Sequence, residues 1–411
     1  MPPPGVELDR LGFLTIGLFD GDNPGPGHQT TLEIIELGER LGFDSAWVRD
    51  RHLQYGISSP VAILAAASQR TRRIELGTAV IPLGWENPLR LAEDLGTVDV
   101  LSGGRLNPGV SVGPPMHFED VKAALYPDTA GVEDFGYERV SRLLRLVGGE
   151  PASTFSGLEG MEQFSSRVQP HSPGLRGRMW YGGASTSSAR WAGQHRMNFL
   201  TSSVVRVEGS TDFAAIQQAH IRAFRAAHPD GPAARVSQGL VVIPTDSATA
   251  GQRARYAAYV EARTPRTASP QGPARMMFAR DLLGSSSQIA EALYAHAGFR
   301  EVREVAFALR SGRSPSRCPS ASSPRTTCRS CPTWRKSSGR PWAGGPPRTA
   351  RAVPSGLWSS TSAARCGRTH RGKAVTCLRR CRRGTASART RPGATPWRAT
   401  RPSTRRPAST R

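Results

Sequence analysis

The chain has 411 residues and a formal net charge of +23, values that taken whole suggest a nucleic-acid binder. The charge distribution excludes this class for most of the chain, because residues 311–411 contain 22 Arg, 2 Lys and no acidic residue. Residues 1–310 hold 31 basic and 32 acidic side chains and are nearly neutral. All six cysteines also lie in 311–411, so a disulfide framework does not hold residues 1–310 together.

The sequence shows no pattern typical of targeting or membrane insertion. The first residues lack the charged segment and apolar run of a signal peptide. No apolar stretch approaches the roughly 18 residues that a membrane span needs. We therefore expect a cytoplasmic protein that makes no contact with a membrane.

Residues 1–310 consist, in chain order, of eight apolar strand-like segments separated by helical patterns. The expected strands are Phe13–Phe19, Ser45–Val48, Arg73–Ile81, Leu106–Gly113, Met179–Tyr181, Met197–Thr201, Val236–Ile243 and Val302–Leu309. The expected helices cover 30–41, 60–69, 87–101, 138–147, the residues after 185, 212–227, 248–262 and 287–296. Residues 114–133 and 149–177 show no clear pattern, and we expect irregular loops there.

Alternation of strands and helices predicts an α/β fold with a parallel sheet, and eight such units fit a (β/α)8 barrel, the TIM-barrel architecture. A doubly wound open sheet is the alternative. No G-x-G-x-x-G segment follows the first expected strand, which argues against the dinucleotide-binding version of that sheet. Residues 1–310 are also long enough to form this barrel as one domain.

Three ionisable residues, Asp50, Arg51 and His52, follow the second expected strand. Barrel enzymes bind their ligands at the C-terminal ends of the strands, so these residues are candidates for catalysis. His52 is suited to general acid–base catalysis or to hydrogen bonding with a ligand. The alternative is a surface pair of Asp50 and Arg51 with His52 packed beneath it.

A glycine- and serine-rich segment, Gly182–Ser188, links the fifth expected strand to a helix. Such a segment predicts an anion site, because backbone N–H groups and hydroxyls at a helix N-terminus hold phosphate. The alternative is an ordinary serine N-cap preceded by glycine turn residues. Within residues 1–310, no His, Asp or Glu grouping has metal-ligand spacing, so we expect no metal site there. The other residues at strand ends are Asp20, Gly21, Gly77, Thr78, Ala79, Ser111, Val112, Gly113, Thr201, Ser202 and Ser203.

Residues 311–411 have the composition that an out-of-frame reading of a GC-rich gene produces. Arg, Ser, Thr, Pro, Ala, Gly, Cys and Trp supply 94 of these 101 residues, and their codons all have G or C in the middle position. We interpret the segment as a disordered frameshift product that begins near Arg310 and lacks the helix expected after the eighth strand. The alternatives are a basic tail that binds polyanions and a zinc module at Cys328/Cys331 and Cys377/Cys381.

Five segments in register resemble the luciferase-like flavin-dependent monooxygenases, the group that contains the bacterial luciferase subunits and the deazaflavin-dependent reductases. The resemblance extends from about Gly12 to Leu309. The matching segments are Leu41–Val48 with the acidic residue and His52 that follow, Glu75–Pro82, Asn87–Asp94, Asp99–Leu106 and Gly182–Trp191.

The resemblance implies a barrel that binds reduced flavin at the strand ends, with the flavin phosphate on the loop 183–188. The flavin ring would lie near Gly77, Thr78 and Ala79, and residues Ser111, Val112 and Gly113 would line the site. The implied cofactor-binding residues on the loop are Gly182, Gly183, Ala184, Ser185 and Ser188. His52 would lie beside the flavin, with Asp50 and Arg51 as the other candidate catalytic residues.

Three positions depart from the luciferase pattern. Arg51 replaces the first histidine of a His-His pair, Ser111 replaces a reactive cysteine, and Val112 replaces an arginine that meets phosphate. Light emission is therefore not expected, and phosphate binding would depend more strongly on the loop 183–188.

The resemblance implies an enzyme that uses reduced FMN and molecular oxygen on a small organic substrate. It would receive FMN from a separate flavin reductase, bind no specific nucleic acid, and form a homodimer. Two alternatives remain open at this point: a deazaflavin-dependent hydride transfer on the same fold, and an inactive frameshifted product.

Overall fold

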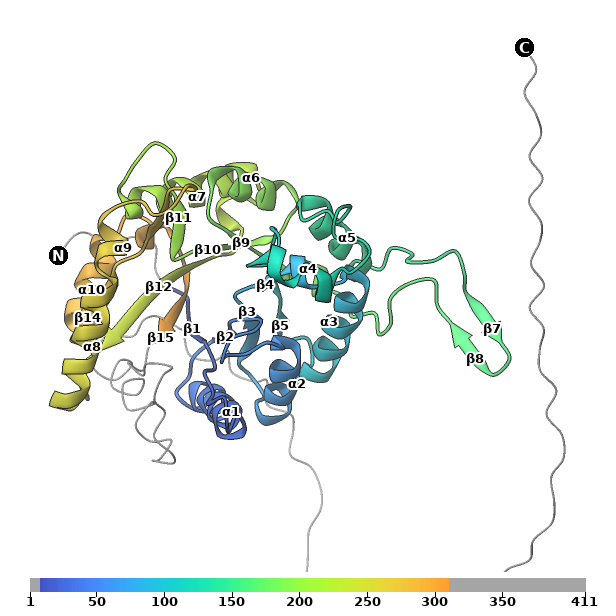
Figure 1. Ribbon diagram of the computed structural model, residues 1–411, viewed down its shortest axis with the longest axis horizontal. Coiled ribbons are helices and arrows are strands. Elements are labelled where there is room, and N and C mark those ends of the chain that lie inside the picture. The colour runs from blue at the N-terminus through green and yellow to red at the C-terminus, as the bar shows by residue number, and fades with distance from the viewer. Residues whose placement is uncertain (1–7, 310–411) are drawn as a thin grey trace, which may run out of the picture. The chain divides into compact units, whose positions relative to one another are not determined.

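A computed structural model describes residues 8–309 of the chain (Figure 1). The expectations for 311–411, including the disordered tail, the two cysteine pairs and the absent helix, lie outside the described residues. Within residues 8–309, no helix has both the length and the apolar composition to cross a membrane.

The main sheet is a ring of parallel strands, as the predicted barrel requires. Ten strands follow one another by hydrogen bonding in the order β4-β6-β9-β10-β12-β15-β1-β2-β3-β5. β3 and β4 are the two halves of one barrel strand, and β5 and β6 are the two halves of the next. Because β3 pairs with β5 and β4 pairs with β6, the first and last strands of this order are neighbours, and the ring closes. The strands are β1 Arg10–Thr15, β2 Ser45–Val48, β3 Glu75–Thr78, β4 Ile81–Pro82, β5 Leu106–Asn107, β6 Gly109–Ser111, β9 Trp180–Gly183, β10 Asn198–Thr201, β12 Val236–Pro244 and β15 Glu304–Leu309.

Two of the eight barrel strands are interrupted, which the sequence did not predict. The third consists of β3 and β4, separated by Ala79 and Val80, which are joined by a cis peptide bond. The fourth consists of β5 and β6, separated by Pro108. Proline has no N–H to donate to a ladder, so a break at this position is expected of any strand that contains it.

Helices surround the ring, and each predicted helix is present within a few residues of its expected bounds (Figure 1). They are α1 Gly25–Arg40, α2 Pro60–Arg70, α3 Pro88–Ser102, α5 Tyr137–Val147, α6 Thr186–Gln194, α7 Phe213–Ala227, α8 Ala250–Arg263 and α10 Ser286–Ala295. Helix α3 ends at Gly103, which adopts a left-handed φ of 69°.

The two segments expected to be irregular contain regular structure. Helix α4, Phe118–Leu125, forms within 114–133. Strands β7, Gly157–Glu159, and β8, Glu162–Phe164, form a hairpin that projects away from the barrel (Figure 1). The expectation was wrong because these elements are too short for a periodicity to be visible. Other short elements are α9 Pro265–Ala268, β11 Val204–Arg206, β13 Met276–Phe278 and β14 Asp281–Gly284.

Two tryptophans fill the barrel interior. The rings of Trp47 and Trp180 meet edge to face, with centroids 5.3 Å apart. Gly77 makes room for this pair, since a Cβ there would lie 2.3 Å from the Trp47 ring. The Trp180 indole donates to Asn107 Oδ1 at 3.0 Å, and the Arg235 guanidinium lies 4.8 Å from the ring centroid. Such a cation over an indole is attracted by the ring quadrupole.

Arg235 also joins an ion network at the N-terminal end of the barrel. Its Nη2 lies 2.9 Å from Glu304 Oε2 and 3.0 Å from Glu75 Oε2, and Arg10 Nη2 lies 2.6 Å from Glu75 Oε1. Burial alone lowers the pKa of Arg235, but the two carboxylates outweigh burial and raise it overall. Burial raises the pKa of Glu304 despite the neighbouring arginines. Arg235 therefore offsets part of the effect of burial on the pKa of Glu304.

We expect Arg235→Met to lower the free energy of unfolding by about 3–5 kcal/mol, because it leaves the Glu304 carboxylate buried without its main partner. The double variant Arg235→Met/Glu304→Met should recover much of that loss. The matched control is Arg303→Met, which removes an exposed arginine paired with Asp9 and should cost less than about 1 kcal/mol. Urea unfolding measures all three, and equal losses for Arg235→Met and Arg303→Met would contradict a structural role for the network.

Candidate active site

The sequence-predicted site residues gather at the C-terminal ends of the barrel strands. Asp50 and His52 follow β2, Ser111 ends β6, and Gly183 ends β9. Residues 83–86 follow β4 at the same end and complete one side of the barrel mouth. A ligand at this end can therefore meet side chains from several strands at once.

Asp50 and His52 lie together, and Glu86 is the third member of their cluster. His52 Nε2 lies 3.3 Å from Asp50 Oδ2, and one ligand atom from each of the three residues lies within 4.8 Å of the others. The Asp50 side chain is fully buried, and neither of its oxygens has a hydrogen-bond partner. The alternative of a surface pair is therefore wrong, because Asp50 is enclosed. Arg51 is half-buried, and its backbone N–H donates to Ile57 O at 2.7 Å.

The cluster is arranged to hold a proton. Burial raises the pKa of Glu86, and the negative charge of Asp50 raises it further. The His52 ring is stacked on Trp85 with centroids 4.2 Å apart and an angle of 14° between the planes, which fixes its orientation. Enzymes that transfer protons often place an oriented imidazole beside a carboxyl group with a raised pKa, so His52 and Glu86 remain candidates for such a role.

One histidine and two carboxylates are also ligand types that bind divalent cations. Sequence spacing gave no sign of this set, because Glu86 lies on a different strand end from Asp50 and His52. Assays of this site therefore need a chelator control.

Arg139, which the sequence analysis missed, positions the loop that carries Trp85 and Glu86. This arginine on α5 is only 4% exposed. Its Nε donates to Leu83 O at 2.8 Å and its Nη2 to Glu86 O at 2.9 Å, while Nη1 pairs with Glu133 Oε2 at 2.8 Å. A signal was present in the sequence, since Arg139 lies on the apolar face of its helix. A charged residue on such a face indicates a buried partner.

Gly77 and Thr78 are buried and contribute to packing, so only Ala79 of the predicted ring-contact residues is partly exposed. Thr78 Oγ1 donates to Gly109 O and accepts from Gly109 N, both at 2.8 Å, and so links the third and fourth barrel strands. Ala79, Val80 and Leu14 pack against the tryptophan pair and are partly buried. These three side chains form an apolar rim that a planar ring system can contact.

Residues Ser111, Val112 and Gly113 are partly buried at the end of the fourth barrel strand. Val112 packs against the main core cluster. Gly113 has a φ of 118°, and its N–H donates to Phe135 O at 2.9 Å. The left-handed conformation favours glycine at this position.

The segment Gly182–Ser188 contains a serine N-cap at the start of α6, which was one of its two interpretations. Ser188 N donates to Ser185 Oγ and Ser185 N donates to Ser188 Oγ, both at 3.2 Å, which forms a reciprocal capping box. Glycine is required before it, because a Cβ on Gly182 would lie 2.7 Å from Val80 and one on Gly183 would lie 2.6 Å from Phe199. Anion binding at this helix start stays a prediction. Ala184, the remaining predicted residue of the loop, is partly buried, and its carbonyl accepts from Arg206 N at 2.7 Å.

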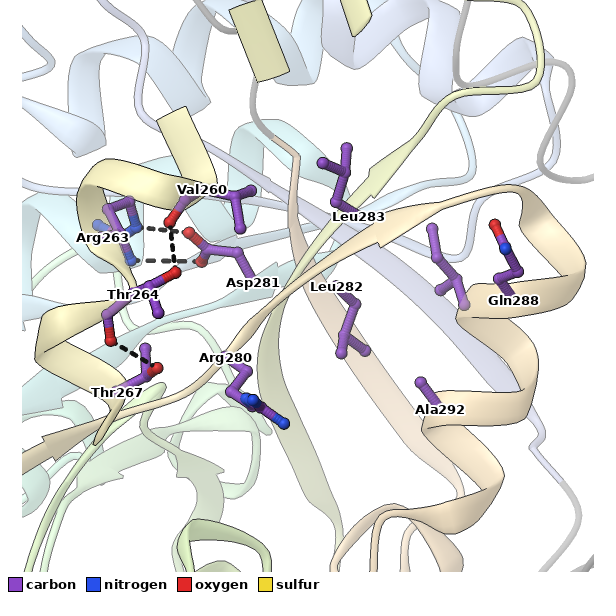
Figure 2. Close-up of a pocket in the computed structure, with 11 residues that line it drawn as sticks. Val260, Arg263, Thr264, Thr267, Arg280, Asp281, Leu282, Leu283, Gln288 and Ala292 are labelled. Atoms are coloured by element: carbon purple, nitrogen blue, oxygen red, sulfur yellow. Dashed lines mark hydrogen bonds and ion pairs between the residues drawn. The ribbon is translucent and has the colours of Figure 1, made fainter. Parts of the chain in front are cut away.

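A separate cavity of about 420 Å³ lies between α8, α9, β14 and α10. Figure 2 shows Arg263 paired with Asp281 on one side of it, with Arg263 Nε 2.5 Å from Asp281 Oδ2, and Leu282 and Leu283 on β14. None of the predicted site residues lines this cavity. Arg263 and Asp281 are paired with each other in this cavity, unlike the Asp50, His52 and Glu86 cluster at the barrel mouth.

Residues 10–301 match the sequence profile of the luciferase-like monooxygenases. The chain belongs to this family. A relative, 4-hydroxyprotoasukamycin monooxygenase of Streptomyces nodosus subsp. asukaensis, is 34% identical over 154 residues, which are 36% of this chain and 40% of that protein. The match thus spans less than half the length of that relative.

Solved structures of other proteins have the same fold. The oxygenating constituent of 3,6-diketocamphane monooxygenase from Pseudomonas putida, in complex with FMN, superposes with a TM-score of 0.53 at 14% identity, over 74% of this chain and 92% of its own. The coenzyme F420-dependent tetrahydromethanopterin reductase of Methanopyrus kandleri superposes with a TM-score of 0.52 at 16% identity, over 74% and 93%. The predicted family and barrel fold are confirmed.

We expect Arg139→Met to destabilise the protein by about 3 kcal/mol, because it removes a buried donor from two backbone carbonyls and from the partly exposed Glu133 carboxylate. Hydrogen exchange at residues 83–86 should also become faster. Arg142→Met is the matched control, since Arg142 lies on the same helix and is exposed. Urea unfolding and exchange mass spectrometry measure both effects, and unchanged exchange at 83–86 in Arg139→Met would contradict the positioning role.

Proposed function

We propose that this protein is a flavin-dependent monooxygenase that uses reduced FMN and molecular oxygen to hydroxylate or otherwise oxygenate a small organic substrate. The balanced reaction consumes reduced FMN, oxygen and substrate, and it yields oxidised FMN, water and a product that carries one oxygen atom. A separate flavin reductase would regenerate the reduced cofactor. The observation that carries the proposal is the barrel mouth, where an apolar rim, a proton-holding cluster and a helix N-terminus occupy neighbouring strand ends.

The residues at the mouth fit the parts of FMN. Ala79 and Val80 offer partly buried apolar surface to a ring system. The N-terminus of α6, with Ser185 and Ser188, offers backbone N–H groups and hydroxyls to a phosphate. Reduced flavin, when bound, would supply the electrons that activate oxygen.

His52 and Glu86 would handle the protons of this reaction. His52 Nε2 lies 3.3 Å from the buried Asp50 carboxylate, and the imidazole would exchange a proton with a bound ligand from this position. Glu86, with its raised pKa, would be a second proton carrier in the same cluster. Arg51 would contribute positive charge at the mouth, where the reaction uses an anionic cofactor.

The alternative function is a hydride transfer that uses a deazaflavin in place of FMN. One structural neighbour, the tetrahydromethanopterin reductase, depends on coenzyme F420. The proton-holding cluster would serve that reaction equally well, so the geometry of residues 8–309 favours neither cofactor by itself. A homodimer and a cytoplasmic location are parts of the same proposal, as is the absence of specific nucleic-acid binding. We do not expect light emission, because Arg51, Ser111 and Val112 differ from the luciferase pattern.

The test is an anaerobic titration of the protein with reduced FMN, riboflavin and coenzyme F420, followed by admission of oxygen. We expect FMN to bind and be reoxidised with oxygen uptake, whereas tight binding of F420 alone would establish the alternative function. A chain that binds none of the three ligands would be the inactive product.

The same titration tests the phosphate position. We expect Ser185→Ala/Ser188→Ala to weaken FMN binding roughly tenfold and riboflavin binding less than twofold, because only FMN carries a phosphate. The matched control is Thr249→Ala/Gln252→Ala, which removes the similar capping box of α8. Equal losses of affinity for FMN and riboflavin would show that the phosphate does not bind at the start of α6.

A further inference from the structure

The N-terminus of α6 already holds an anion that belongs to the chain itself. Glu208 Oε2 accepts a hydrogen bond from Thr186 N at 2.8 Å, which occupies the first N–H group of the helix. The Glu208 side chain is 27% exposed and therefore reaches this position from the surface. A carboxylate placed there receives the stabilisation that a helix N-terminus gives to any anion.

A buried histidine lies directly behind this carboxylate. The His220 side chain on α7 is 1% exposed, its Nε2 lies 3.6 Å from Glu208 Oε2, and neither ring nitrogen has a hydrogen-bond partner. Burial lowers the pKa of His220, so the ring is neutral near pH 7 and can donate one N–H toward an anion. The imidazole therefore lies close to the oxygen that Glu208 places at the helix start, and it is enclosed there with no hydrogen-bond partner for its ring nitrogens.

The segment that carries Glu208 is attached to the same loop. Arg206 N, at the end of β11, donates to Ala184 O at 2.7 Å, and Val207 N donates to Arg275 O at 3.0 Å. Gly209 follows with a φ of 108°, a conformation that favours glycine. Glu208 is therefore held beside α6 by its backbone neighbours, while its side chain can turn to solvent without breaking these bonds.

We propose that Glu208 is a specificity-determining residue that competes with the phosphate of an incoming flavin for the N-terminus of α6. This inference rests on the proposed flavin site. When the phosphate binds, it takes the hydrogen bond of Thr186 N, and the Glu208 carboxylate moves away because two anions at one site repel each other. A flavin without phosphate leaves Glu208 in place.

The competition has a consequence for cofactor choice. Burial on its own raises the pKa of Glu208, but the hydrogen bonds from Thr186 and the interaction with His220 lower it overall, so the side chain is ionised at neutral pH. Val112 adds no positive charge on the neighbouring strand end. The phosphate of FMN therefore adds less affinity in this chain than an unoccupied helix start would give it.

The test compares flavin affinities of the wild-type chain and Glu208→Gln. The glutamine keeps an oxygen that can accept from Thr186 N, so the helix start stays capped while its charge is removed. We expect FMN to bind Glu208→Gln roughly tenfold more tightly and riboflavin to change less than twofold. The matched control is Glu159→Gln, which removes the same charge from the exposed strand β7 and should change neither affinity.

A second measurement uses inorganic phosphate alone and so separates this inference from the flavin proposal. Phosphate should raise the melting temperature of Glu208→Gln more than that of the wild-type chain or Glu159→Gln. Glu208→Asp has a shorter side chain, and phosphate should raise its melting temperature in the same way but to a smaller extent. This variant replaces Glu208→Gln in the test if Glu208→Gln folds poorly. If no flavin binds any variant but phosphate stabilises Glu208→Gln selectively, the flavin proposal fails and the competition stands. Equal phosphate responses in all variants, or equal changes for FMN and riboflavin, would overturn the competition.

Discussion

The Arg235 guanidinium lies against the face of Trp180 and between the carboxylates of Glu304 and Glu75 at the N-terminal end of the barrel. Together with the Trp47–Trp180 pair, this network packs the barrel interior with large side chains. The apolar rim of Leu14, Ala79 and Val80 is partly buried against the tryptophan pair. The packed interior thus places any chemistry at the mouth, which agrees with the general behaviour of these barrels.

The mouth combines two electrostatic features on different strand ends. After β2 and β4, a buried carboxylate without hydrogen-bond partners lies beside an oriented histidine and a carboxyl group with a raised pKa. After β9, a helix N-terminus attracts negative charge, and the chain places Glu208 there. One feature is suited to moving protons and the other to holding an anion. A ligand with a ring system and a phosphate, such as FMN, would engage both features.

Much of the fold could be predicted from the sequence, because the eight strands are apolar segments bounded by turns and helical patterns. The strand Ser45–Val48 has the predicted bounds. The break at Ala79–Val80 was not predicted, since it depends on how neighbouring strands pair, and the break at Pro108 was missed although the proline itself indicates it. Helix α4 and the β7–β8 hairpin were missed because short elements carry little periodicity.

The candidate site was predictable only where its residues directly follow strands. Asp50, His52 and Ser185 do so, and they were identified because ligands of such barrels bind at the C-terminal ends of the strands. Glu86 and Glu208 lie on other segments, and only the closed barrel brings them to the site. Arg139 acts from a helix through backbone carbonyls, which no spacing motif records.

The measurement that tests the central claim most directly is a crystal structure of the protein with FMN bound. We expect the phosphate to accept hydrogen bonds at the start of α6, with Glu208 turned away from Thr186 and the ring system against Ala79 and Val80. We expect His52 to lie beside that ring. A flavin bound in the cavity between α8 and α10, or a phosphate in solvent with Glu208 still on Thr186, would contradict the claim.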